Sequence, residues 1–214
     1  MWTRSPITLT LVAVLAATAR AQSIAELAVG EESRVWIEGS SNIHGWSCSA
    51  TAIDATIAVD VTFREDPDFP RYLKSVQVKV PVSALKCGHA QMEKSLRRAL
   101  KAEDPTRPAY ITAIFESVRD GADTTNTLTV STVGALAIAG HENAVKMDVV
   151  TTRLADGTIE ARGAVPILMS DFGIEPPTAL FGALRASNRV VVKFAMKLGP
   201  EVVAAMAARC SLAR

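Results

Sequence analysis

The sequence predicts an all-β protein: an eight-stranded antiparallel β-barrel with one inserted α-helix and a short second helix. Three observations lead to this fold class. Eight segments alternate apolar and polar residues with the period of two that is typical of half-buried strands. Most are joined by short segments rich in turn residues, which favours antiparallel neighbours. Closing such a sheet into a barrel removes its exposed edges.

Each predicted strand has one apolar face and one polar face. In the second, Ile53, Ala55, Ile57, Val59, Val61 and Phe63 alternate with mainly polar residues. Between the sixth and seventh strands, Asp156-Gly157 is a strong signal for a two-residue hairpin. The predicted strands are Ser33–Glu38, Ile53–Phe63, Val76–Val82, Tyr110–Val118, Thr127–Ala139, Val145–Arg153, Thr158–Leu168 and Val190–Leu198.

Helical periodicity is clear in one segment. Within Gln91–Ala102, residues Met92, Leu96 and Leu100 are spaced four apart, which places them on one face of a helix that Asp104-Pro105 ends. The short second helix is predicted at Thr178–Leu184, after Pro176-Pro177. The Ala-rich tail, Glu201–Arg214, is also predicted to be helical.

The N-terminus has the three parts of a secretory signal peptide. Arg4 precedes the apolar run Ile7–Ala17, and Ala19 and Ala21 supply small residues before a cleavage site. The apolar run is too short to span a bilayer, so no stable membrane insertion is expected after cleavage. We therefore expect a signal peptide at 1–21, one barrel domain at 33–198 and a C-terminal tail at 199–214.

The charge balance argues against nucleic acid as a partner. The 23 Lys and Arg residues offset 22 Asp and Glu residues, which leaves a formal net charge of +1 and no basic field for phosphates. Removing residues 1–21 deletes two arginines and no acidic residue, which lowers the net charge to −1. Aromatic residues make up 5% of the chain, too few for a platform on which bases stack.

If the protein is exported, two of its three cysteines are expected to form a disulfide. Cys48 and Cys87 flank two strand-like segments, whereas Cys210 lies in the tail, so the first two are the expected disulfide. Cys210 would then be a free thiol or an intermolecular link that makes a homodimer.

Small residues on the apolar strand faces favour a cavity inside the barrel. They include Ala55, Ala113, Ala135, Ala137, Ala161 and Gly163. The alternative is that these residues pack against the helices. The phase of Tyr110–Val118 is ambiguous, because Ile111 and Phe115 face the side opposite Tyr110 and Ile114. The predicted cavity lining is Ile57, Val59, Val78, Ile114 or Phe115, Ile138, Val149, Ala161, Val192 and Phe194.

Five local patterns, in order, resemble the YceI-like family. The first is Ser33–Cys48, with the sequence SRVWIEGSSNIHGWSC, and the second is Leu-Lys-Cys-Gly at Leu85–Gly88. Next come the Met-x3-Leu-x3-Leu helix at Met92–Leu100 and the Gly-x-Leu-x-Ile-x-Gly strand at Gly134–Gly140. The last is Met-Ser-Asp-Phe-Gly-Ile at Met169–Ile174, which a valine-rich final strand follows.

The resemblance implies an exported bacterial protein, expected in the periplasm, with a lipocalin-like barrel that holds a long isoprenoid or other apolar, lipid-like chain. It implies no shared catalytic machinery and no cofactor. The chain departs from the family pattern at Ala137, where threonine is usual, and at His141-Glu142-Asn143, where a basic residue usually follows the glycine. A basic residue that the family often has is also absent at Met169 and Ser170.

Two other classes of function compete with a carrier. A barrel with a filled core could act as an envelope or stress protein through its surface. A metal-dependent enzyme or hydrolase, ranked last, would use His44, Cys48, Cys87 and His89, although their spacing is unlike the usual zinc motifs. Export also favours a disulfide over thiolate ligands.

Overall fold

The structure is a computed structural model that describes residues 23–27, 32–59, 73–104, 106, 109–123 and 126–212. Its strands are antiparallel and follow one another in the sheet order β1-β4-β5-β7-β8-β9-β10-β12-β2-β3-β6, with β11 paired to β12 beside this path. The strands are β1 Ser23–Leu27, β2 Arg34–Ser41, β3 Gly45–Ala50, β4 Asp54–Val59, β5 Leu73–Pro81, β6 Leu85–Lys86, β7 Tyr110–Asp123, β8 Thr127–Ile138, β9 His141–Arg153, β10 Ile159–Leu168, β11 Thr178–Ala179 and β12 Leu184–Leu198.

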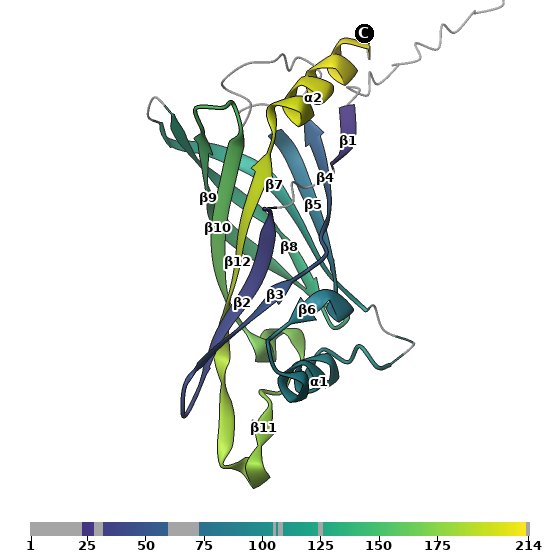
Figure 1. Cartoon of the computed structure of the whole chain (residues 1–214), viewed down its shortest axis with the longest axis vertical. Coiled ribbons are helices and arrows are strands. Elements are labelled where there is room, and N and C mark those ends of the chain that lie inside the picture. Colours follow the sequence, from purple (N-terminus) through teal and green to yellow (C-terminus); the bar gives the residue numbers. More distant parts are fainter. Residues whose placement is uncertain are drawn as a thin grey trace, which may run out of the picture.

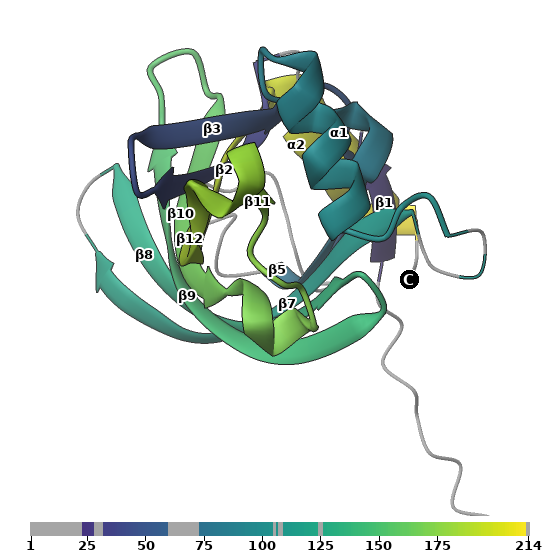
Figure 2. The ribbon, with the colours of Figure 1, turned by 90° about the horizontal axis from the view of Figure 1, so that it is seen from below.

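The sheet curls around a central axis into a barrel, as the view along that axis shows (Figure 2). Strands β1 and β6 are the two ends of the sheet order. In the described ranges no strand pairing joins these two ends, so the barrel is curled but not closed by a continuous ladder of hydrogen bonds.

Two α-helices lie at opposite ends of the barrel (Figure 1). Helix α1, Ala90–Ala99, lies at the lower end in Figure 1, near β6 and β11, and α2, Pro200–Leu212, lies at the upper end. Short 3-10 helices complete the lower end: η2 Val82–Ala84, η3 Met169–Phe172 and η4 Leu180–Gly182.

The all-β barrel prediction is confirmed, but the predicted number of strands is wrong. All eight predicted segments contain strands, and β1, β3, β6 and β11 are additional. Of the short helix predicted at Thr178–Leu184, the structure has only the single 3-10 turn η4, because the segment begins with β11 and Leu184 starts β12. The predicted signal peptide, 1–21, and the end of the second predicted strand, 60–63, lie outside the described residues.

A hairpin does join β9 to β10 at Asp156-Gly157, but its connection runs from Leu154 to Thr158, so the predicted two-residue loop is wrong. Gly157 has a φ of +85°, a left-handed conformation that glycine adopts without steric cost. The Asp156 carboxylate accepts a hydrogen bond from the Thr158 backbone N–H at 2.9 Å. Hydrogen bonds from Thr158 hold the pKa of the Asp156 carboxyl below its ordinary value.

Candidate functional site: an apolar cavity with two chambers

The lower chamber of the barrel lies at the end where α1, η3 and β11 are found. It has a volume of about 500 Å³, which is within the usual range for a ligand pocket. Its apolar wall comes from strands β2, β3, β5, β6, β7, β8, β10 and β12 and from α1 and η3. Its apolar side chains include Val35, Ile37, Trp46, Val80, Leu85, Met92, Leu96, Leu100, Ile111, Ile138, Ile167, Met169, Phe172, Ile174, Leu184, Val190 and Val192.

The upper chamber continues from there toward α2. It has a volume of about 160 Å³ and an almost wholly apolar lining. Its two polar side chains are Thr132 and Thr151, and each hydroxyl donates a 2.8 Å hydrogen bond to a backbone carbonyl, of Met147 and Leu128 respectively. Because both hydroxyl protons are already donated to the protein, Thr132 and Thr151 can offer a ligand only acceptor lone pairs, and the rest of the lining is hydrocarbon.

The two chambers adjoin along the length of the barrel. Val35, Val80, Ile111 and Val192 line both of them. On β12 the lower chamber is lined from Leu184 to Val192 and the upper chamber from Val192 to Leu198. At the ordinary rise of a strand these residues span roughly 45 Å of backbone. The cavity therefore suits a long, thin apolar molecule.

Polar side chains of the lining gather in the lower chamber. They are Ser41, His44, His89, Gln91, Ser95 and Thr178, and we call them the mouth. His44, His89, Gln91 and Thr178 are exposed to solvent. Among the described residues that line either chamber, none is Lys, Arg, Asp or Glu. The mouth can therefore form hydrogen bonds with a polar group of a ligand, but it has no Lys, Arg, Asp or Glu side chain to pair with a charged group.

Hydrogen bonds fix the turn between β2 and β3 beside the mouth. The Asn42 side chain donates to the Ala183 carbonyl at 2.8 Å and accepts from the Arg185 N–H at 2.9 Å. This joins the turn to the start of β12. The Ser41 hydroxyl donates to the His44 carbonyl at 2.9 Å. The His44 Nδ1 lies 2.9 Å from the Gly45 carbonyl oxygen, so this imidazole has a backbone partner.

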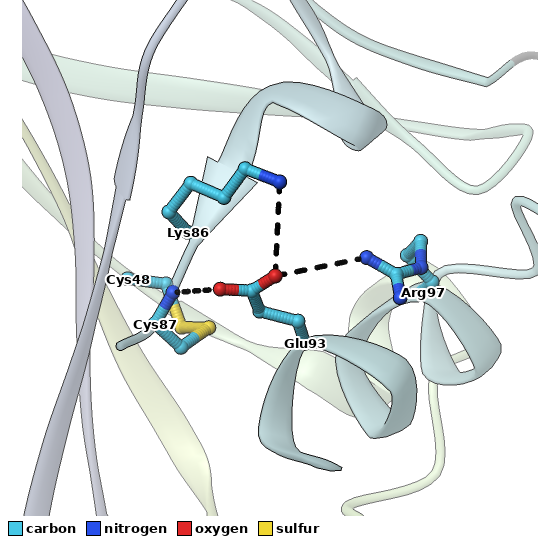
Figure 3. Close-up of a disulfide and its surroundings, with 5 residues drawn as sticks. All are labelled: Cys48, Lys86, Cys87, Glu93 and Arg97. Carbon is cyan, nitrogen blue, oxygen red and sulfur yellow. Dashed lines mark hydrogen bonds and ion pairs between the residues drawn. A yellow bond between two sulfur atoms is a disulfide. The ribbon is translucent and has the colours of Figure 1, made fainter. Parts of the chain in front are cut away.

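A disulfide and a carboxylate fix the segment that leads into α1 (Figure 3). Cys48 of β3 is bonded to Cys87, which confirms the predicted pair. The Glu93 Oε1 accepts a hydrogen bond from the Cys87 backbone N–H at 3.2 Å. The Glu93 Oε2 lies 3.7 Å from Lys86 Nζ and 3.9 Å from Arg97 Nη1. Helix α1, which supplies one wall of the lower chamber, is therefore anchored to β3 and β6.

Ion pairs lie on the outer face of the barrel, away from the cavity. Val35 and Ile37 line the lower chamber, so Trp36 between them and Glu38 after them face outward by the alternation of the strand. Glu38 accepts hydrogen bonds from Lys193 Nζ at 2.7 Å and from Trp36 Nε1 at 2.8 Å. These two donors, Lys193 first, hold the pKa of the Glu38 carboxyl below its ordinary value. In the same way, Arg162 lowers the pKa of Glu160.

A family model for the YceI-like domain matches residues 29–198. The chain belongs to the YceI-like family. The suggested resemblance is thus confirmed over most of the chain, including every strand from β2 to β12. Helix α2 lies beyond the matched residues.

Two solved structures share this YceI-like fold. The Burkholderia cenocepacia protein BcnA has a TM-score of 0.60 and 17% identity, covering 80% of this chain and 99% of that one. A polyisoprenoid binding domain from Saccharophagus degradans, implicated in plant cell wall breakdown, also has a TM-score of 0.60, with 14% identity, 83% coverage of this chain and 98% of that one. At these identities the likeness establishes the fold. No curated protein matches the sequence.

Most of the predicted lining residues lie in the walls of the YceI-like barrel. Ile57, Val78, Phe115, Val149, Ala161 and Phe194 line the upper chamber, Ile138 lines the lower one and Val192 lines both. Ile114 was an incorrect alternative, since it is 42% exposed and Phe115 beside it faces inward. The side chain of Val59 lies outside the part that the structure describes.

The interpretation of two alanines as inward-facing is also wrong. On β8, Leu136 lines the upper chamber and Ile138 the lower one, so Ala135 and Ala137 face outward by the alternation of the strand. Space in the upper chamber comes instead from Ala55, Ala113 and Ala161, which line it.

The histidine and cysteine residues do not form the alternative metal site. The sulfur atoms of Cys48 and Cys87 are bonded to each other, so neither is available as a thiolate ligand or nucleophile. In the described part of the chain, no three His, Cys, Asp or Glu side chains come together as a metal site. His44 and His89 instead lie at the mouth of the cavity.

Several cavity residues were not in the predicted lining. Met92, Leu96 and Leu100 of the α1 segment line the lower chamber, as does Phe172 of η3. The apolar face of α1 was visible as four-residue spacing, but the spacing does not reveal which surface the helix covers. Neither α1 nor α2, the α-helices of the described ranges, is long and apolar enough to span a membrane.

Proposed function

We infer that the protein is an exported carrier that holds a polyisoprenoid or similar lipid-like chain inside its barrel. The observation that carries this proposal is the pair of adjoining apolar chambers, which follow one another along the barrel and have no charged side chain among their described lining residues. The polyisoprenoid class is suggested by the Saccharophagus degradans domain of the same fold. The proposal assigns no catalytic residue and requires no cofactor.

The distribution of polar groups gives the bound chain a direction. Each methylene group buried in the cavity contributes about 0.8 kcal/mol. A polar group placed in the upper chamber would exchange water for an almost wholly apolar lining, in which Thr132 and Thr151 have no free hydroxyl proton to donate. The apolar tail therefore lies toward α2, and the polar end lies at the mouth near His44, His89 and Gln91.

Mass spectrometry of a solvent extract tests the carrier proposal directly. Purified protein is extracted with organic solvent, and the extract is compared with that of a protein of unrelated fold prepared in the same way. We expect one lipid in roughly equal molar amount to the protein. Repeatedly empty extracts, together with no binding of added polyprenols, would contradict the carrier and favour the alternative of an envelope protein acting through its surface.

A pair of variants on one strand tests whether the chain occupies the cavity. Val192 lines both chambers, and Val191 beside it faces the outer side of β12. Val192→Phe narrows the connection between the chambers, so we expect long polyprenols to bind at least tenfold more weakly. Val191→Phe adds the same volume outside and is the matched control. Equal effects of the two substitutions would show that the chain does not pass this point.

Export to the periplasm is proposed on two grounds. Residues 1–21 have the organisation of a signal peptide, and the Cys48–Cys87 disulfide suits an oxidising compartment. Intact mass measurement of the protein recovered from a bacterial periplasmic fraction checks this proposal. The expected product begins at Gln22, and a protein retained in the cytoplasm with residues 1–21 attached would contradict it.

A further inference from the structure

The end of the cavity beneath α2 is built by three strands and a helix. Ile57 of β4, Ile159 of β10 and Leu198 of β12 line the upper chamber. These three side chains are buried in one cluster with Val203 and Met206 of α2. These three residues form the end of the cavity that is farthest from the mouth, and we call them, Ile57, Ile159 and Leu198, the floor of the cavity.

Helix α2 is held firmly against this floor. Val203 and Met206 are 2% and 1% exposed, which places them among the most deeply buried side chains of the described residues. The helix follows β12 after a single glycine, and the Val203 N–H donates to the Gly199 carbonyl at 3.3 Å. The helix lies at the upper end of the barrel (Figure 1). A chain that enters at the mouth and reaches these three residues therefore meets an apolar wall with α2 packed behind it.

We propose that the floor and α2 set the longest apolar chain that the cavity accepts. This inference rests on the proposed carrier function. As a chain lengthens, each added methylene gains affinity only while it finds room in the upper chamber. Once its tip reaches Ile159 and Leu198, further carbons must stay at the mouth, where the lining is polar. Affinity for a homologous series of ligands then stops rising at a defined length.

The floor lies within the YceI-like domain, whereas the helix packed behind it lies outside that domain. The family model ends at Leu198, and Val203 and Met206 come after it. The barrel supplies the apolar walls, whereas the helix that follows it decides where the cavity ends. The length limit is thus a property of this chain's C-terminal helix in addition to the shared fold.

Two variants move the floor in opposite directions. The double variant Ile159→Ala, Met206→Ala removes one floor side chain and the side chain behind it. Ala161→Leu instead fills the upper chamber two residues along β10 from Ile159. Leu128→Ala is the matched control, because Leu128 is buried at 8% exposure but lines neither chamber. The ligands are farnesol, geranylgeraniol, solanesol and undecaprenol, titrated into full-length mature protein after removal of bound lipid.

In the unmodified protein we expect affinity to rise along this series and then level off or fall. The double variant should bind the first alcohol beyond that limit about tenfold more tightly than the unmodified protein does, and Ala161→Leu should move the limit to a shorter alcohol. Leu128→Ala should leave the limit unchanged. If all the alcohols bind but the limit stays the same in both cavity variants, the length inference is overturned and the carrier function stands. If none of the alcohols binds the unmodified protein, the carrier function itself fails.

If the double variant does not fold, Ala161→Leu still decides the question, because it adds volume and leaves α2 intact. An unchanged limit in a folded Ala161→Leu protein overturns the proposal, and a shortened limit supports it. Circular dichroism of each variant establishes which outcome applies.

Discussion

Gly163 keeps the upper chamber open by the absence of a side chain. It is paired with Phe194 on β12, and a Cβ at this position would lie 2.5 Å from Phe194 Cε1 and 2.8 Å from Met147 Sδ. Both atoms belong to flexible side chains that would have to move. The nearest free space for them is the chamber that Phe194 and Met147 already line.

Substitution of Gly163 by alanine should therefore reduce ligand binding more than it reduces stability. We expect Gly163→Ala to weaken the binding of geranylgeraniol about tenfold, because the displaced side chains fill part of the upper chamber. Fluorescence titration measures the affinity. Gly45→Ala is the control, since a Cβ there is in ordinary contact at 3.7 Å from the Gly39 carbonyl oxygen. Unchanged affinity in Gly163→Ala would mean that the chain does not reach this chamber.

The Glu38 carboxylate should titrate at unusually low pH. Its pKa is lowered by hydrogen bonds from Lys193 and Trp36, so it stabilises the folded state above the pKa of the unfolded chain. That contribution is lost as the pH falls through the lower, folded-state pKa. NMR of the side-chain carboxyl carbon should give a midpoint below about 4.3, the value for an unperturbed glutamate.

Replacing the main donor to Glu38 provides the control for this titration. Lys193→Gln should raise the midpoint toward the ordinary value, whereas Lys146→Gln, at an exposed site on β9, should not. An ordinary midpoint in the unmodified protein would show that the Lys193–Glu38 pair does not persist in solution.

The residue scale also shows why part of the lining could not be predicted from one strand. In Tyr110–Val118 both faces carry large apolar residues, so polarity does not decide between Ile114 and Phe115. The register decides it: Phe115 is paired with Val76 and Ala113 with Val78, and both valines line the upper chamber. That register is a property of two strands that are far apart in the sequence. By contrast, the strands that contain Phe194 and Ala161 have one clearly more polar face, and this difference predicts which of their residues face inward.

At the scale of elements, long alternating strands were predictable and short ones were not. Strand β3 does alternate, with buried Cys48 between exposed Ser47 and Ser49, but its small polar residues give a weak signal. Strands β6 and β11 have two residues each, too few for a period. They form because a neighbouring strand presents unpaired backbone groups, and the sequence of the short strand does not contain that information.

The disulfide should stabilise the fold substantially through the element it anchors. Cys48 and Cys87 are 39 residues apart, and closing a loop of this length contributes about 4 kcal/mol in the chain-entropy model. We expect Cys48→Ser, Cys87→Ser to lower the free energy of unfolding by about this amount in urea. Cys210→Ser is the control and should change it little. A loss below about 1 kcal/mol would show that α1 is held mainly by Glu93 and apolar packing.

The same protein samples show whether Cys210 is a free thiol or forms an intermolecular disulfide. Electrophoresis without reductant shows whether the unmodified chain forms the predicted Cys210-linked homodimer or keeps a free thiol. A dimer band that disappears in Cys210→Ser would support the intermolecular link.

At the scale of the whole molecule, the cavity exists because the inward-facing side chains do not fill the whole length of the barrel. The barrel is long enough for two apolar clusters, one near Phe172 at the lower end and one near Met206 at the upper end. Between them, inward positions carry small or β-branched residues such as Ala55, Ala113 and Val192. Helix α2 packs behind the upper chamber, and α1 lines the lower chamber beside the mouth. Sequence alternation predicted the walls, but only the packing of α1 and α2 defines the chambers.

An unfilled interior should make stability depend on ligand. A chain that binds only the folded state adds about 2.7 kcal/mol to the free energy of unfolding when its free concentration is a hundred times its dissociation constant. For a domain of this size that corresponds to a rise in Tm of roughly 5–10 °C. Thermal unfolding of lipid-free protein, with and without geranylgeraniol, measures the effect. Val192→Phe should show a much smaller rise at the same ligand concentration, because the narrowed connection excludes the tail from the upper chamber, and Val191→Phe should respond like the unmodified protein. An equal rise in all three proteins would place the ligand on the outer surface and would remove the main support for a carrier.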